Sequence, residues 1–188
     1  MHYLRDEIPI KINGMNTGQM LITIGAMTLL GLMLLRVNNN FLNTNTVLME
    51  NKFGVVAVSL ATSIMEEAKS KAFDAKTDTN SVTYTTELTP ASSLGPAGYE
   101  SYPDFNDFDD FNGLNIQTAG DTTFASAVFD ISCEVYYVQP TSPDVKYNDR
   151  TWHKKLIVTV TSQSMHDIST ATQDTLQLST IFSYWYYR

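Results

Sequence analysis

The feature that most constrains this chain is an uncharged apolar segment near its N-terminus. Residues 19–35 read QMLITIGAMTLLGLMLL, and Arg36 is the first charged residue after them. As an α-helix these 17 residues would measure about 25 Å, close to the roughly 30 Å hydrocarbon core of a bilayer. We therefore expect residues 19–36 to form a helix that lipid or other helices shelter from water.

Small residues interrupt the large apolar side chains of this segment. Gly25, Ala26 and Gly31 would let a neighbouring helix approach closely. The pattern predicts that the helix packs among copies of itself; a lone membrane anchor, in which the glycines have no such role, is the alternative. The residues expected in the bundle are Met20, Leu21, Ile24, Gly25, Met27, Leu29, Gly31, Leu32 and Leu35.

A second helical pattern follows at residues 47–74. Its apolar stripe consists of Phe53, Val56, Ala57, Leu60, Ile64 and Ala68. Between the two patterns, residues 37–46 are rich in Asn and Thr, whose side chains compete for backbone hydrogen bonds. We therefore expect residues 19–74 to form one very long helix or two collinear helices, with the weakest point at residues 37–46.

Residues 75–188 predict a globular head built from β-strands. Apolar and polar residues alternate in three segments near the C-terminus, which predicts three strands. A shorter alternation from Val82 to Leu88 predicts one further short strand within a looped connection. We expect an antiparallel meander covered by the second helical pattern, which makes the fold α+β, with a long N-terminal hydrophobic helix and a small sheet. The residues expected to face inward are Phe129, Ile131, Cys133, Val135, Tyr137, Leu156, Val158, Val160, Leu176, Leu178, Phe182 and Tyr184.

An acidic loop, DFNDFDDFNG at residues 104–113, offers oxygen ligands of the kind that calcium prefers. The candidate ligands are Asp104, Asp107, Asp109, Asp110 and Asn112. The spacing does not match an EF-hand. The alternative interpretation is a turn in which Asp and Asn accept hydrogen bonds from nearby backbone N–H groups, while Phe105, Phe108 and Phe111 anchor the loop to the core.

Composition and motifs argue against several other functions. The net charge of −8 and the scattered distribution of 12 Lys and Arg residues argue against nucleic-acid binding. Cys133 is the single cysteine, on the apolar face of its strand, so it is expected to be a small buried hydrophobe. His2, His153 and His166 lack the spacing of metal ligands. With no phosphate-binding loop, zinc pattern or nucleophile elbow, we expect neither an enzyme nor a bound cofactor.

The order of these features resembles the type IV pilin and type II secretion pseudopilin superfamily. The matching features are Gly18 followed by Gln19, the uncharged helix, the polar segment, the amphipathic continuation, the acidic loop and the β-rich head. The resemblance implies a lollipop-shaped subunit and cleavage by a prepilin peptidase after Gly18, with residues 1–18 as a leader or N-terminal extension. At the fifth position after the cleavage site, where the family usually has Glu, this sequence has Thr23.

The same resemblance implies a structural subunit of a pilus-like filament or pseudopilus. Its partners would be identical subunits, and it would reside in the inner membrane before assembly into an extracellular filament by dedicated machinery. A different interpretation is a single-pass membrane protein that presents a ligand-binding or sensory domain outside the cytoplasm. A third is a component of a phage or secretion tube, in which a helix of lipid-spanning length has no ready explanation.

Overall fold

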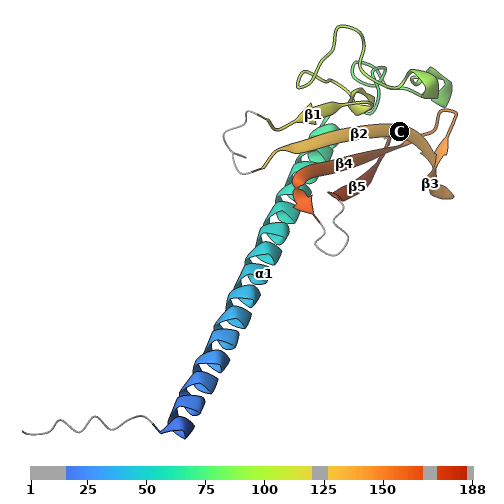
Figure 1. The fold of residues 1–188 in the computed structure, drawn as a ribbon. Coiled ribbons are helices and arrows are strands. Elements are labelled where there is room, and N and C mark those ends of the chain that lie inside the picture. Colours follow the sequence, from blue (N-terminus) through green and yellow to red (C-terminus); the bar gives the residue numbers. More distant parts are fainter. Residues whose placement is uncertain (1–15, 120–126, 167–172, 186–188) are drawn as a thin grey trace, which may run out of the picture. The chain divides into compact units, whose positions relative to one another are not determined.

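The computed structural model describes residues 16–119, 127–166 and 173–185, and Figure 1 shows its fold. As predicted, the fold is α+β: a long N-terminal helix, α1 (Thr17–Ser70), is followed by an antiparallel sheet. The chain divides into two compact units, Met1–Val47 and Leu48–Arg188. Most of the predicted leader and the aromatic residues Tyr186 and Tyr187 lie outside the described residues.

Helix α1 continues without a break through the Asn- and Thr-rich residues 37–46. The hydroxyl of Thr44 donates to the carbonyl of Asn40 at 2.8 Å, and the hydroxyl of Thr46 donates to the carbonyl of Leu42 at 3.0 Å. These side chains therefore bond back onto the preceding turn of their own helix. Of the two alternatives from the sequence, the structure has the single helix.

In the second unit, the predicted apolar stripe of α1 forms part of the hydrophobic core. Phe53 and Ile64 are buried, and Ala57, Ala61 and Ala68 have exposures of 0%. Val56 and Leu60 are partly buried against the same core. These alanines belong to the same hydrophobic core cluster as the buried residues of β2 and β4.

The burial of this alanine face predicts a large difference between leucine substitutions at two positions that are two residues apart on the helix. We expect Ala57→Leu to lower the free energy of unfolding by about 1–3 kcal/mol, because the added methylenes enter a filled space. Ser59→Leu is the matched control, since Ser59 is exposed and a change there is expected to stay within about 0.5 kcal/mol. Urea unfolding measures both values, and equal effects would contradict the packing of this face.

The described strands form one antiparallel sheet with the path β1-β2-β4-β5, and β3 pairs with β2. Their bounds are β1 Asn115–Gln117, β2 Phe129–Gln139, β3 Ser142–Tyr147, β4 His153–His166 and β5 Gln173–Ser183. The pairs Cys133↔Val158 and Val158↔Leu178 fix the register of the three long strands. These three strands are the predicted meander, and the residues predicted to face inward on β2 and β4 are all buried.

The prediction of a strand at residues 82–88 was wrong. The structure has a short 3₁₀ helix there, Thr85–Glu87, and Tyr84 is exposed. A carboxylate oxygen of Glu87 accepts hydrogen bonds from the backbone N–H groups of Thr83 and Tyr84, which closes a local turn. The sequence interpretation also missed β1 and β3, which are short or mostly exposed strands at the free edge of β2.

Helix α1 ends at Ser70, four residues before the predicted end. Beyond it, Ala72 forms a parallel bridge with Asp107: the Ala72 N–H donates to the Asn106 carbonyl at 3.2 Å, and the Phe108 N–H donates to the Ala72 carbonyl at 2.8 Å. The backbone after the helix therefore pairs with the acidic loop. This pairing brings Phe73 and Asp74 to the region where the loop meets the sheet.

Candidate functional site

The N-terminal part of α1 is a candidate assembly surface, because its apolar side chains are uncovered. An 18-residue window of the helix has a mean hydropathy of 2.0, and none of that window is buried. The helix is thus long and apolar enough to cross a membrane. The exposed fraction is 68% at Leu21 and 70% at Leu29.

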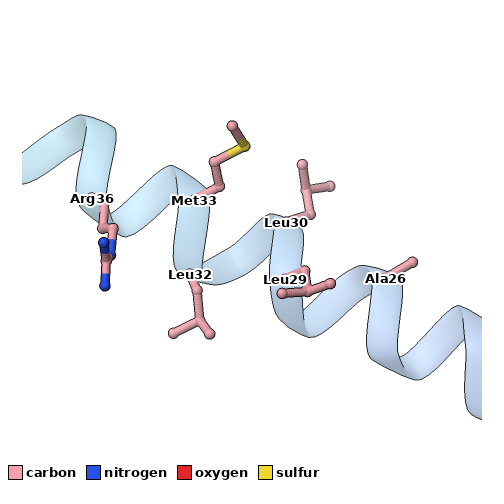
Figure 2. A pocket seen from close by; sticks show the side chains of 6 residues that line it. All are labelled: Ala26, Leu29, Leu30, Leu32, Met33 and Arg36. Atoms are coloured by element: carbon pink, nitrogen blue, oxygen red, sulfur yellow. The ribbon is translucent and has the colours of Figure 1, made fainter.

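Apolar side chains project from opposite sides of this helix. Figure 2 shows Leu30 and Met33 on one side and Leu32 on the other, with Arg36 one turn further along. The exposures of Leu30, Leu32 and Met33 lie between 58% and 67%. A helix that is apolar on all sides is stable only when its whole circumference is buried. Within the first unit, the described residues supply no such cover.

The residues predicted to pack in a helix bundle all lie on this helix. The large ones, Met20, Leu21, Ile24, Met27, Leu29, Leu32 and Leu35, are exposed by half or more. A Cβ atom added at Gly25 or Gly31 would meet no atom within 4 Å. Among the described residues, packing therefore does not require either position to be a glycine.

The predicted processing site lies at the first turn of α1. Gly18 and Gln19 are exposed, and the Gln19 N–H donates to the Asn16 carbonyl at 2.8 Å. The hydroxyl of Thr23, the residue at the family's usual Glu position, donates to the carbonyls of Gln19 and Met20. Thr23 therefore satisfies its polar group within its own helix.

The acidic loop forms a second candidate site, and its carboxylates accept local hydrogen bonds. Asp107 Oδ1 accepts from the N–H groups of Asp109 and Asp110 at 2.8 and 3.2 Å. Asp110 Oδ2 accepts from the N–H groups of Asn106 and Asp107 at 3.0 and 3.1 Å. The loop is also held by three buried rings, as predicted: Phe105, Phe108 and Phe111.

The five predicted calcium ligands do not converge on one point. Asp104 is exposed. Asn112 joins two segments instead, because its Oδ1 accepts from the Val135 N–H at 3.0 Å and its Nδ2 donates to the Leu94 carbonyl at 2.9 Å. Among the described residues, no group of three or more His, Cys, Asp or Glu side chains could hold a metal ion. Calcium binding by this loop stays a prediction, and in the described part of the chain the side chains of Asp107, Asp110 and Asn112 take part in the hydrogen bonds given above.

A buried ion cluster lies where the acidic loop meets β4. Lys154 Nζ donates to Asp109 Oδ1 at 2.5 Å, to Asp74 Oδ2 at 2.8 Å and to the Phe73 carbonyl at 2.8 Å. The side chains of Lys154, Asp74 and Asp109 have exposures of 0%, 0% and 3%. All three hydrogens of the ammonium group are thus used inside the protein. We call Lys154, Asp74, Asp107 and Asp109 the buried cluster.

Asp74 and Asp107 have opposite pKa shifts. Burial acts to raise the pKa of Asp74, but the Lys154 charge and the N–H groups of Lys76 and Thr89 outweigh it and lower the pKa overall. Burial, and after it the neighbouring Asp109 carboxylate, raise the pKa of Asp107 to about 8. Burial also raises the pKa of Asp109. These shifts favour the protonated form of Asp107, which shares a side-chain hydrogen bond with Asp109, and the ionised form of Asp74.

The sequence interpretation missed Asp74 and Lys154. A signal for Lys154 was present, because it lies two residues before Leu156 and four before Val158. Residues at this spacing share one face of a strand, so Lys154 belongs to the inward face. A lysine at such a position needs a buried anionic partner. No comparable signal existed for Asp74, which lies in the connection after α1 and meets Lys154 across 80 positions of sequence.

The other residues singled out for chemistry have structural contacts. Cys133 is buried, as predicted, and burial raises the pKa of its thiol to about 12. His153 Nδ1 lies 2.7 Å from the Ser183 hydroxyl. The side chain of His166 and all of His2 lie outside what the structure describes. Trp185 is 78% exposed.

Comparison with known proteins adds no family to this description. No protein-family model matches the chain, and neither does any curated protein or any solved structure. The feature of the molecule itself that bears on function is the uncovered apolar segment of α1.

Proposed function

We propose that this chain is a structural subunit that assembles through its N-terminal helix into a type IV pilus-like filament or pseudopilus. The observation that carries the proposal is the apolar segment of α1, which is uncovered on all sides. A surface of this kind requires lipid or other helices around it. The residues and order of elements that resemble the pilin superfamily support the choice of filament.

The proposal gives this helix two successive environments. In the inner membrane, lipid covers it, and in the filament, the helices of identical subunits cover it. Because lipid tails and apolar side chains are similar surroundings, the exchange costs little hydrophobic free energy. Contacts between non-equivalent surfaces of identical subunits generate an open-ended helical assembly.

Two measurements on the native protein test this function. We expect cells that produce the chain to release it in filaments on mechanical shearing, visible by electron microscopy. We expect N-terminal sequencing of those filaments to begin at Gln19, since the proposal includes cleavage after Gly18. A chain that stays in the membrane fraction as a monomer or dimer with residues 1–18 attached would instead support the membrane-anchored ligand-binding or sensory protein.

A pair of substitutions at Gly25 tests the role of close helix packing. The space around Gly25 is open in the single chain, so a larger side chain has nothing to clash with there. We expect Gly25→Leu to abolish filaments while the head folds normally, because leucine holds neighbouring helices apart. Gly25→Ala is the control, because it keeps a small residue at this position, and it is expected to retain most of the assembly. Normal filaments from Gly25→Leu would contradict tight packing at this position.

A further inference from the structure

The ammonium group of Lys154 and the carboxylate of Asp109 lie in contact in a part of the head that solvent does not reach. Nζ is 2.5 Å from Oδ1, and the two side chains are 0% and 3% exposed. The Phe73 and Tyr137 rings flank Nζ, with their centroids at 4.6 and 5.4 Å. An amine and a carboxyl group that could condense to an amide are thus held together in a dry, aromatic-lined site.

We propose that Lys154 and Asp109 form an intramolecular isopeptide bond between Nζ and Cγ, with Asp74 and Asp107 as the groups that move the protons. This modification is independent of the proposed function in filaments. It would join β4 covalently to the acidic loop that precedes β1.

The reaction is a condensation that releases one water molecule. Asp74, with Oδ2 2.8 Å from Nζ, accepts a proton from the ammonium group and leaves an amine with a free electron pair. The amine attacks Cγ of Asp109, so a C–N bond forms and one C–O bond breaks. Asp107 protonates the departing oxygen. The second proton that Nζ loses replaces the one that Asp107 gave up, and Asp74 passes its proton to the same departing oxygen, which completes the water. Both carboxyl groups then have their starting protonation states, so no other reactant is needed.

The hydrogen bonds select Asp109 rather than Asp74 as the acceptor. The carboxylate of Asp74 accepts hydrogen bonds from the N–H groups of Lys76 and Thr89 and from the Thr89 hydroxyl. These donors stabilise its anionic form, which is a poor electrophile. Asp109 instead hydrogen-bonds to the protonated carboxyl group of Asp107, which withdraws charge from the group under attack.

The site also favours the bond over the separated ions. Two charges buried away from water are costly even when they are paired, and an amide replaces them with a neutral group. Nζ lies 2.5 Å from an oxygen of the carboxyl group that it would attack, and holding two reacting groups together in this way can raise rates by many orders of magnitude. Because the released water leaves a buried site, hydrolysis of the amide is disfavoured.

The mass of the full-length wild-type chain decides the proposal. We expect an intact mass one water lower than the sequence requires, and a protease digest that yields one branched peptide joining Lys154 to Asp109. Lys154→Arg is expected to show the unmodified mass, because a guanidinium group does not form this bond. A wild-type chain of unmodified mass would overturn the proposal, and so would a branch at Asp74 or a water loss that persists in Lys154→Arg.

Two asparagine variants separate the roles of the carboxyl groups. Asp109→Asn keeps an acceptor carbonyl but releases ammonia, so we expect its cross-linked product to have the same mass as cross-linked wild type. Asp107→Asn keeps the hydrogen bonds of the loop but donates a proton poorly, so we expect a large uncross-linked fraction. Asp110→Asn is the control, because the Asp110 carboxylate accepts hydrogen bonds from the backbone N–H groups of Asn106 and Asp107. An uncross-linked fraction as large in Asp110→Asn would exclude a proton-transfer role for Asp107.

Discussion

Replacing Lys154 with methionine is expected to lower the free energy of unfolding of the head by about 3–5 kcal/mol, the range seen when one partner of a buried ion pair is removed. The substitution leaves Asp74 and Asp109 buried with no cation beside them. Burial of unpaired charge is among the largest single-residue costs in a protein. Urea unfolding of the full-length chain in a mild detergent measures the loss in free energy of unfolding. Near-ultraviolet circular dichroism monitors the transition.

Lys146→Met provides the matched control for this result. Lys146 pairs with Glu134 at 3.2 Å, but both side chains are more than half exposed, so the expected cost is below about 1 kcal/mol. Adding Asp109→Asn to Lys154→Met should recover part of the lost stability, because it removes one of the unpaired charges. Equal losses in the Lys146 and Lys154 variants would contradict a buried cluster. If the proposed amide forms, the loss measured for Lys154→Met includes its contribution.

The second large effect is expected at Leu29, in the middle of the uncovered apolar helix. Leu29→Asp should abolish filaments, because every subunit would carry an unpaired carboxylate into the apolar helix bundle. A charged residue at the centre of such a helix costs about 2.5–3.5 kcal/mol even in a membrane, and an assembly repeats this cost at each subunit. Electron microscopy and the amount of chain in the sheared fraction measure the outcome.

The fold of the head is expected to stay intact in this variant. Leu29 is 70% exposed, and it belongs to the unit Met1–Val47 rather than to the unit that contains the sheet. Asn39→Asp is the control, since it adds the same charge to the polar part of the helix at an exposed position. Normal filaments from Leu29→Asp would contradict a buried helix bundle, whatever the behaviour of the control.

The elements that the sequence predicted well are those with a strong local period. The stripe from Phe53 to Ala68 repeats at helical spacing, and the strand from Phe129 to Tyr137 alternates at every second residue, so neighbours along the chain already define the buried face. The alternation from Val82 to Leu88 failed because Glu87 bonds to nearby backbone N–H groups and forms a turn. Alternation alone does not show whether a partner strand is available.

The sequence by itself determined that the N-terminal segment of the long helix, residues 19–35, is apolar with no charged face, and that the C-terminal half of the chain forms an antiparallel sheet. Only the tertiary structure decided where the helix ends and which donors the carboxylates of the acidic loop bond to. It also decided which charged side chains meet inside the head. The physical reason is that Lys154 contacts Asp109 and Asp74 across 45 and 80 positions. Local periodicity reports which face of an element is buried, whereas the partners on that face depend on how distant segments pack together.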